Sequence, residues 1–324
     1  MKKLTTLTSV LLMLALSLTG CGNTDSQAEP APYQIGISQY AQHASLDNCL
    51  TGFLEGLEQA GLVEGTDFEA HIQNAGADDA LATQIGLGFS AEKADLMVGI
   101  ATPSAVACYA AAEERDIPVI FTAITDPVGA GLDSGNVTGT SDVLPVEAQL
   151  QLIRQLQPEA RSIGLIYTTS EPNSVYSVGI YQELAGQYGF TMEALGVTSQ
   201  PEVTQAADTL LARGVDCLTN ITDNNVTSVL PAILEKTNEA NVPVYGSEVE
   251  QMKLGCVAGA GLDYVQLGIQ TGMMAAKVLR GEATCQELPY EIIEQYELCI
   301  NSDALTALSL TAPEELLAQA TDVR

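Results

Sequence analysis

Hydroxyl and carboxylate side chains follow two apolar stretches of the sequence, at points where buried strands are expected to end. These stretches, Leu96–Ala101 and Val119–Ile124, flank a helix-forming segment of small residues, Pro103–Glu114. The polar residues at their ends are Thr102, Ser104, Thr122, Thr125 and Asp126. In an open α/β sheet, solutes bind at the carboxyl ends of the strands, where helix N-termini and backbone N–H groups favour anions. The pattern therefore predicts a pocket for a small, polar and partly anionic solute, with ordinary helix capping as the alternative.

Strands and helices alternate along the chain, and this alternation must position the polar residues. The first series adds strands Gln34–Gln39 and Phe68–Ile72 and helices Leu46–Ala60 and Ala80–Ala91. Asn136–Ser141, with Gly135 and Gly139, breaks the rhythm as a crossover would. After Pro145 the second series comprises helices Val146–Leu156, Asn173–Tyr188, Glu202–Ala212 and Val226–Ala240 and strands Ser162–Thr168, Thr191–Val197, Asp216–Thr222 and Pro243–Gly246. The pattern predicts an α/β fold of two doubly wound lobes with a cleft between them.

The second series repeats the polar strand ends of the first. The residues concerned are Glu171, Asn173, Ser174, Thr222, Asp223, Asn224 and Ser247. Polar residues thus follow many strand ends in both lobes. A shared site explains this pattern better than helix capping does. A cleft lined from both sides is the architecture of a hinge-closing solute receptor.

The N-terminal part of the chain predicts export and anchoring. Lys2 and Lys3 precede the apolar run Leu4–Leu18, whose length and flanks are typical of a secretory signal and not of a transmembrane span. Leu18-Thr19-Gly20-Cys21 resembles a bacterial lipobox, so residues 1–21 are predicted to be a lipoprotein signal peptide with lipidation at Cys21. Residues 22–32 are polar, with Pro and Ala, and predict a flexible tether. We expect a lipid-anchored protein on the extracytoplasmic face of the membrane.

Composition and motifs exclude several classes of function. A formal charge of −29, from 41 acidic and 12 basic residues, argues against nucleic acid as a partner, which needs a basic surface. The chain has only 2 histidines and no CxxC spacing, so no metal site is predicted. GxSxG, Walker A, HExxH and helix-leading GxGxxG motifs are missing, so we predict neither an enzyme nor a cofactor. Cys108 and Cys217 are expected as core thiols, and pairing of Cys285 with Cys299 stays open.

Several strings along the mature chain carry a family resemblance. They are IGISQY, QNAGAD, IATPSA, FTAITDPVGAGL, GNVTGTSD, EPNS, TDN and GLDYVQLGIQTG, in order between Tyr33 and about Ser302. Together they closely resemble the substrate-binding lipoproteins of ABC transporters, and within these the tryptophan/tyrosine type that includes the TrpX-like proteins. Tyr40 departs from relatives that often carry Phe there. The resemblance implies a type I periplasmic-binding-protein fold, with the solute enclosed between two lobes joined by a three-crossing hinge.

The resemblance also implies where the lobes divide. Crossings are expected near Ser141–Asp142, near Ser247–Glu248 and near Thr284–Leu288. Lobe 1 would then comprise residues 33–141 and 249–283, and lobe 2 residues 142–248 and 284–324. The helix Tyr264–Leu279 would return to lobe 1, and Pro289–Leu308 would finish in lobe 2.

A free amino acid presents a carboxylate, an ammonium and a side chain, and residues of the predicted cleft suit each group. Hydroxyl donors at a helix N-terminus suit the carboxylate, and the expected residues are Thr102, Ser104 and Thr122. A carboxylate away from water suits the ammonium, and the expected residues are first Asp223, then Asp142, Glu171 and Asp263. For Asp223 and Asp263, helix capping is the alternative.

An aromatic solute side chain needs aromatic or apolar walls, for which Tyr40 and Tyr264 are expected. Packing in the hinge is the alternative role for these two residues. The other predicted binding residues are Ser38, Gln39, Thr125, Ser141, Asn173, Ser174, Thr222, Asn224 and Ser247. Asp126 is a secondary candidate, because Pro127 and the glycines after it are equally typical of a turn.

These observations predict the extracytoplasmic solute-binding component of an ABC importer. It would capture a small solute, an aromatic amino acid by the resemblance, and deliver it to a permease and its ATPase. A sensory receptor of the same fold that does not transport is the alternative, and the residues do not separate the two. A secreted hydrolase is a further alternative, because active sites also occupy such clefts.

Overall fold

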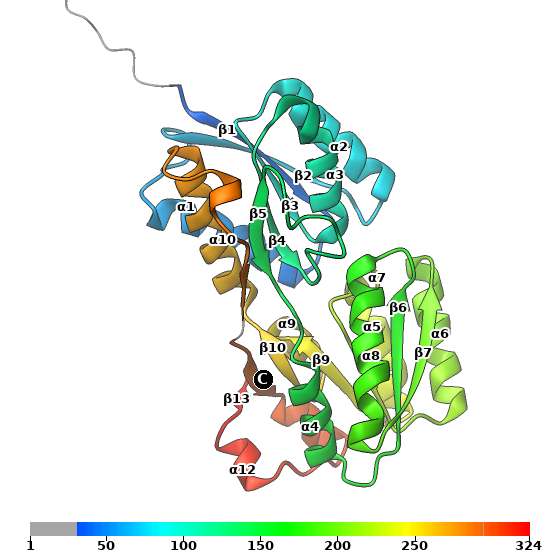
Figure 1. Cartoon of the computed structure of the whole chain (residues 1–324). Helices are drawn as coiled ribbons and strands as arrows, with labels where there is room; N and C mark the ends of the chain where they lie inside the picture. The colour runs from blue at the N-terminus through cyan, green and yellow to red at the C-terminus, as the bar shows by residue number, and fades with distance from the viewer. Residues whose placement is uncertain (1–30, 294) are drawn as a thin grey trace, which may run out of the picture. The chain divides into compact units, whose positions relative to one another are not determined.

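The computed structural model describes residues 31–293 and 295–324. The predicted signal peptide 1–21 with Cys21, and most of the tether 22–32, lie outside these residues. The described chain forms two sheets, each flanked by helices, and we call each sheet with its helices a lobe (Figure 1). No helix in the described ranges is long and apolar enough to cross a membrane.

Lobe 1 is built on a sheet of strand order β11-β5-β4-β3-β1-β2. Its strands are β1 (Tyr33–Gln39), β2 (Phe68–Asn74), β3 (Leu96–Ile100), β4 (Val119–Ile124), β5 (Val137–Ser141) and β11 (Glu291–Ile292). All pair in parallel. Its helices are α1 (Ala44–Gln59), α2 (Asp79–Glu92), α3 (Thr102–Ala112) and α10 (Tyr264–Leu279). In Figure 1, α2 and α3 cover one face of this sheet and α1 and α10 the other.

The centre of lobe 1 explains why its sequence reads as unbroken apolar runs. Every residue of β3 and β4 is buried, because helices cover both faces of a parallel sheet. The helices α1 and α10 pack at very close range, and this requires glycine. A Cβ atom at Gly52 would overlap the carbonyl oxygen of Val265, and one at Gly268 that of Cys49.

Lobe 2 is built on a sheet of strand order β13-β12-β10-β9-β8-β6-β7. Its strands are β6 (Ser162–Thr168), β7 (Thr191–Val197), β8 (Cys217–Thr219), β9 (Val244–Glu248), β10 (Ala258–Leu262), β12 (Glu297–Ile300) and β13 (Thr321–Asp322). Within the described ranges, β10 and β12 form the one antiparallel pair of this sheet, and the other neighbouring strands pair in parallel. Its helices are α4 (Val146–Leu156), α5 (Pro172–Leu184), α6 (Gln200–Arg213), α7 (Asn224–Ser228), α8 (Leu230–Glu239), α9 (Val249–Leu254), α11 (Ser302–Ala307) and α12 (Glu314–Leu317).

Two of the three predicted crossings between the lobes are wrong. The first lies where expected, since β5 ends at Ser141 and α4 belongs to lobe 2. The second does not lie near Ser247–Glu248, because β10 pairs with β9 in the sheet of lobe 2 and the chain crosses only at Asp263. The third does not lie near Thr284–Leu288, because β11 pairs with β5 and the crossing follows Ile292. Residues 249–262 therefore belong to lobe 2, and 284–292 to lobe 1.

Two predicted elements also differ from the structure. The segment Asn136–Ser141 is a strand of the sheet, β5, and the crossover comes after it. The predicted helix Val226–Ala240 is interrupted at Val229, whose φ of −115° and ψ of 13° separate α7 from α8. Pro231, two residues later, has no backbone N–H and suits the first turn of a new helix.

The six described cysteines are free and buried. Cys108 and Cys217 lie in the core, as predicted. Cys285 and Cys299 do not pair, because they lie in different lobes. The Cys285 thiol faces the carbonyl oxygen of Val119 in lobe 1, whereas Cys299 lies on β12.

Candidate functional site

Among the described residues, and apart from the bonds to Asp142 in the hinge, four side-chain hydrogen bonds join lobe 1 to lobe 2. Three start from the first turns of α1 or the residue before it: His43 Nε2 lies 3.3 Å from Asn224 Oδ1, Ser45 Oγ 2.6 Å from Glu248 Oε2, and Asn48 Nδ2 2.6 Å from Glu250 Oε1. The fourth joins Thr125 Oγ1 and Thr222 Oγ1 at 3.3 Å. Of these bonds, only the one between Thr125 and Thr222 joins two strand ends predicted to line the cleft.

On lobe 1, the wall of this cleft is formed by the ends of β1 and β3. Ser38 Oγ and Ser104 Oγ lie 3.0 Å apart and are fully buried. Thr102 begins α3, and its hydroxyl is buried with no hydrogen-bond partner among residues 31–293 and 295–324. Ala101 before it has a φ of 75°, a left-handed conformation that turns the chain sharply from strand into helix. A buried hydroxyl beside a helix N-terminus is a donor available to an anion.

Tyr40 and Gln39 support the neighbouring loops. The Tyr40 hydroxyl donates to Asp79 Oδ1 at 2.8 Å, and the ring is almost fully buried. Gln39 Nε2 donates to the Ala41 carbonyl oxygen and to Asp47 Oδ1. The hydroxyl of Tyr40 is thus engaged, whereas its ring remains available as a wall.

Thr122 was predicted to lie in the cleft wall, and it does not. Its hydroxyl is within 3.1 Å of Cys49 Sγ and of Thr140 Oγ1, and it accepts a hydrogen bond from Thr271 at 3.0 Å. These partners belong to α1, β5 and α10, so the side chain points into the interior of lobe 1. Side chains alternate along a strand, and Thr122 takes the face opposite to the one its polarity suggested.

On lobe 2, Glu171 is the centre of a group of amides. Its Oε2 accepts hydrogen bonds from Asn224 Nδ2 at 2.7 Å, from the Asn224 backbone N–H at 3.2 Å and from Asn173 Nδ2 at 3.3 Å. Its Oε1 has only a long contact of 3.5 Å, from Asn225 Nδ2. Burial, and next the negative charge of Asp223, raise the pKa of this carboxyl above its usual range. A buried carboxylate with one nearly free oxygen favours a cationic partner.

Asp223, expected first as the partner of the ammonium, instead caps α7. Its Oδ1 accepts from the Val226 backbone N–H and the Thr168 hydroxyl, both at 2.9 Å. Its Oδ2 accepts from the Thr168 backbone N–H at 2.5 Å and from Ser174 Oγ at 2.8 Å. Both oxygens are thereby occupied by donors of lobe 2. The geometry supports the capping alternative for Asp223 and leaves Glu171 as the better acceptor for an ammonium.

The hinge side of the cleft carries a second buried carboxylate, Asp142. It accepts hydrogen bonds from the Tyr264 hydroxyl at 2.7 Å and from the Thr125 hydroxyl at 2.9 Å. Burial raises the pKa of Asp142 to about 6, against the lowering effect of these donors. Tyr264 therefore packs in the hinge and does not form an aromatic wall. The nearby hydroxyls of Ser141 and Ser247 are buried and have no partner in the described part of the chain.

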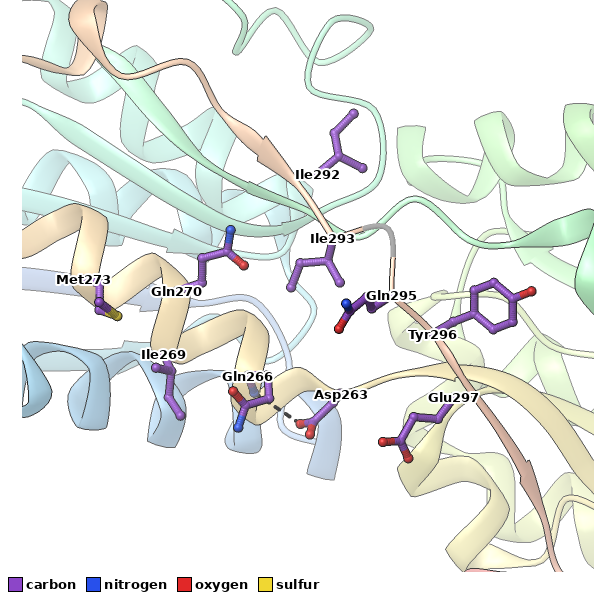
Figure 2. Close-up of a pocket in the computed structure, with 10 residues that line it drawn as sticks. All are labelled: Asp263, Gln266, Ile269, Gln270, Met273, Ile292, Ile293, Gln295, Tyr296 and Glu297. Carbon is purple, nitrogen blue, oxygen red and sulfur yellow. Dashed lines mark hydrogen bonds between the residues drawn. The ribbon is translucent and has the colours of Figure 1, made fainter. Parts of the chain in front are cut away.

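The structure also shows the contacts of three further predicted residues, Asn173, Asp126 and Asp263. Asn173 Nδ2 donates to the Thr222 carbonyl oxygen at 2.8 Å, and its buried Oδ1 has no partner within the described ranges. Asp126 accepts a hydrogen bond from the Gly129 backbone N–H, as expected for its alternative role as a turn residue. Asp263 is exposed and caps α10 through the backbone N–H groups of Val265 and Gln266. It lines a cavity of about 730 Å³ together with residues of α10, Ile292, Ile293 and residues 295–297, and none of these others was predicted as a site residue. Figure 2 shows the side chains that line this cavity.

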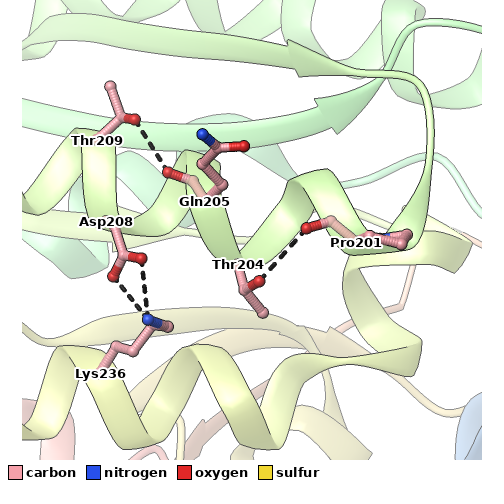
Figure 3. A network of polar contacts seen from close by, with 6 residues as sticks. All are labelled: Pro201, Thr204, Gln205, Asp208, Thr209 and Lys236. Atoms are coloured by element: carbon pink, nitrogen blue, oxygen red, sulfur yellow. Dashed lines mark hydrogen bonds and ion pairs between the residues drawn. The ribbon is translucent and has the colours of Figure 1, made fainter.

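In the described part of the chain, the buried carboxylates of the cleft form no ion pair. None of the ion pairs within residues 31–293 and 295–324 includes Asp142, Glu171, Asp223 or Glu248. The pairs that do form lie on the surface, such as Lys236 with Asp208 at 2.7 Å in Figure 3. Because an unpaired buried charge is costly, this arrangement suits a positively charged solute group.

Two openings of about 390 and 430 Å³ lie along the boundary between the lobes. Both are lined by Asp79 of lobe 1 and Ser170 of lobe 2. The smaller one is apolar, between α2 and α3, with Pro172 across from them; the larger one is polar and reaches Tyr40. Cavities of this size suit a small molecule.

The comparisons with known proteins agree with this geometry. A model of the family described as "ABC transporter substrate binding protein" matches residues 34–324. The chain belongs to this family. Its members bind solutes outside the cytoplasm and are not enzymes. The chain is 37% identical over 311 residues to the tyrosine-binding protein of Clostridioides difficile (strain R20291), covering 90% of this chain and 88% of that one.

Solved structures of similar proteins share the fold of this chain. The chain is similar to a Streptococcus pneumonia ABC domain in complex with L-Trp, with a TM-score of 0.86, 32% identity and coverage of 90% of this chain and 99% of that one. It superposes less well, with a TM-score of 0.67, on a ligand-free, open substrate-binding protein from Clostridium difficile, at 35% identity and the same coverage. A leucine-binding protein from Thermotoga maritima, 11% identical with a TM-score of 0.60, covering 77% of this chain and 83% of that one, shares the fold. The type I periplasmic-binding-protein fold is confirmed.

Sequence reasoning predicted Thr125, Thr222 and Asn224 but missed the other residues that join the lobes. Ser45, Asn48 and His43 lie on or beside the first turns of α1, and Glu248 and Glu250 on or beside α9. One signal was available, because these polar residues also follow the ends of the strands β1 and β9.

Proposed function

We propose that this protein is the solute-binding component of an ABC importer and captures an aromatic amino acid for delivery to a permease and its ATPase. The relatives support the class of solute, since one is named for tyrosine binding and another is a complex with L-Trp. The observation in this chain that carries the proposal is Glu171, which is buried and in no ion pair among the described residues. Its chain neighbours Ser170 and Pro172 line the same opening as Thr102 of the other lobe, whose buried hydroxyl has no partner in the described part of the chain.

The two walls suit the two charged ends of a free amino acid. Thr102 and Ser104 at the N-terminus of α3 would donate to the carboxylate, where the helix dipole also favours a negative charge. Oε1 of Glu171 would accept from the ammonium, since Oε2 is already occupied by amide donors. Tyr40 is the aromatic residue that the larger opening reaches, and its ring would contact the solute side chain.

Solute binding would then favour the arrangement in which the lobes touch. A solute shifts a conformational equilibrium only through contacts that differ between its states. Here the carboxylate and the ammonium are held by different lobes, so both contacts exist together only when the lobes meet. The hydrogen bonds from α1 to Asn224, Glu248 and Glu250 would add to this state.

For the N-terminus, we propose that Cys21 carries the lipid that holds the protein at the membrane. Replacing Cys21 with Ala should release the protein into the soluble fraction, or leave it unprocessed, as judged by fractionation and intact mass. Membrane retention of a processed Cys21→Ala protein would contradict the proposal.

The chain contains no tryptophan, which provides a direct binding assay. Bound L-tryptophan would be the sole indole emitter, so a shift in its emission or a rise in its anisotropy reports binding. A thermal-shift panel of the proteinogenic amino acids and unrelated small solutes would rank the candidates, since a bound solute stabilises the folded state. Stabilisation by a different solute class, with no response to L-tryptophan, L-tyrosine or L-phenylalanine, would refute the amino-acid assignment.

A further inference from the structure

His43 is a partly buried histidine at the boundary between the lobes that the proposed binding of the carboxylate and ammonium leaves unused. It directly precedes α1, and its Nε2 lies 3.3 Å from Asn224 Oδ1 of lobe 2. Its other ring nitrogen, Nδ1, is buried and has no hydrogen-bond partner among residues 31–293 and 295–324. A buried polar atom without a partner costs free energy, so its retention calls for an explanation.

The protonation of this ring follows from its neighbours. Asn224 Nδ2 donates to Glu171 Oε2 at 2.7 Å, which fixes the orientation of the amide and directs its oxygen at His43. The nitrogen that faces this oxygen must carry the proton, so His43 is the Nε2–H tautomer. Burial lowers the pKa of His43 and keeps the ring neutral, although Asn224 and the carboxylate of Asp47 act in the opposite direction. Nδ1 is consequently a bare acceptor.

We infer that Nδ1 of His43 accepts a hydrogen bond from the donor on the solute side chain, and thereby selects solutes that carry one. The inference rests on the proposed function. The indole N–H of tryptophan and the phenol O–H of tyrosine both meet the requirement, whereas the phenyl ring of phenylalanine does not. The ammonium is assigned elsewhere, because Glu171 Oε1 is a charged acceptor and outcompetes a neutral imidazole. Sites that hydrogen-bond a solute group reject analogues that lack it far more strongly than apolar pockets do.

Two pairs of probes test this selection by titration calorimetry: L-tryptophan against 1-methyl-L-tryptophan, and L-tyrosine against L-phenylalanine. The wild-type protein should bind L-tryptophan and L-tyrosine, which carry a side-chain donor, at least about 10-fold more tightly than their partners, because the partners leave a buried acceptor without a hydrogen bond. His43→Gln places an amide N–H near the position of Nε2, and so retains the contact with Asn224 but has no acceptor at Nδ1. His43→Asn retains an acceptor near Nδ1 but does not reach Asn224.

The preference for the donor should fall to within about 3-fold in His43→Gln and persist in His43→Asn, even if both variants bind more weakly overall. A preference that is unchanged in His43→Gln would overturn the inference. That result is expected if 1-methyl-L-tryptophan binds weakly only because its methyl group clashes, or if His43 has only a structural role. If the wild-type protein binds none of the four solutes, the proposed function fails as well. Binding with no preference within either pair overturns the inference alone.

Discussion

Replacing Glu171 with Gln should weaken solute binding and at the same time stabilise the free protein. Both effects follow from a buried negative charge that no cation neutralises among the described residues. Gln is close to Glu in shape, and its single oxygen can take the place of Oε2, which accepts hydrogen bonds from Asn173 and Asn224. Its amide nitrogen then occupies the place of Oε1 and opposes the ammonium of the solute.

The expected magnitudes come from the contacts. Loss of a hydrogen bond between charged groups costs about 2–3 kcal/mol, which corresponds to roughly 30- to 150-fold weaker binding of L-tryptophan. In the free protein, removing the charge ends its repulsion with Asp223, the second cause of the raised pKa of Glu171. A gain of about 1 kcal/mol at pH 8 would raise the melting temperature by roughly 2 °C in a protein of this size.

Fluorescence titration with L-tryptophan and thermal melts of the free protein measure the two effects. Glu239→Gln is the matched control, because Glu239 lies in the same lobe, is exposed at the end of α8 and lines neither opening between the lobes. It should leave the affinity unchanged. Unchanged affinity in Glu171→Gln would remove Glu171 from the site. A lower melting temperature would show that its charge is stabilising, contrary to the reasoning above.

Three further predictions concern other parts of the cleft. Asp223→Ala should lower the melting temperature, because a cap of α7 is lost at a cost of about 1–2 kcal/mol, while any change in affinity should stay smaller than that of the Glu171 variant. A larger loss of affinity would restore Asp223 as the ammonium partner. Burial raises the pKa of Asp142 to about 6 and that of Glu248 to about 8, so the folded state binds protons more tightly than the unfolded state. The stability of the free protein should therefore fall as the pH rises from about 5 to 8. A melting temperature that rises over this range would contradict that prediction, and Glu248→Gln should flatten the fall. Ser45→Ala should weaken solute binding several-fold, because it removes the hydrogen bond from Ser45 to Glu248 between the lobes, whereas Thr51→Ala, on an exposed turn of the same helix, should not. Equal affinities of Ser45→Ala and the wild-type protein in calorimetry would show that this contact does not support closure.

Sequence alone determined the α/β class and most of the element boundaries. The strands Val119–Ile124, Ser162–Thr168 and Thr191–Val197 and the helix Tyr264–Leu279 match the structure at both ends. These features depend on local patterns: apolar runs for strands buried on both faces, apolar spacing for helices, and Gly, Pro and polar residues between them. The polar residues at the ends of parallel strands likewise predicted the facing surfaces, because such ends meet at one edge of a sheet.

The tertiary structure alone decided what each polar residue does. Asp223 and Glu171 look equivalent in sequence, yet Asp223 is saturated by Thr168, 55 positions away, and Ser174, 49 positions away, whereas Glu171 keeps one oxygen nearly free. The crossings were misplaced because strand membership depends on pairing between distant segments, such as β11 with β5. The contacts between the lobes join residues such as Ser45 and Glu248, 203 positions apart. Hydrogen-bond partners at such separations are set by packing, and local patterns carry no record of them.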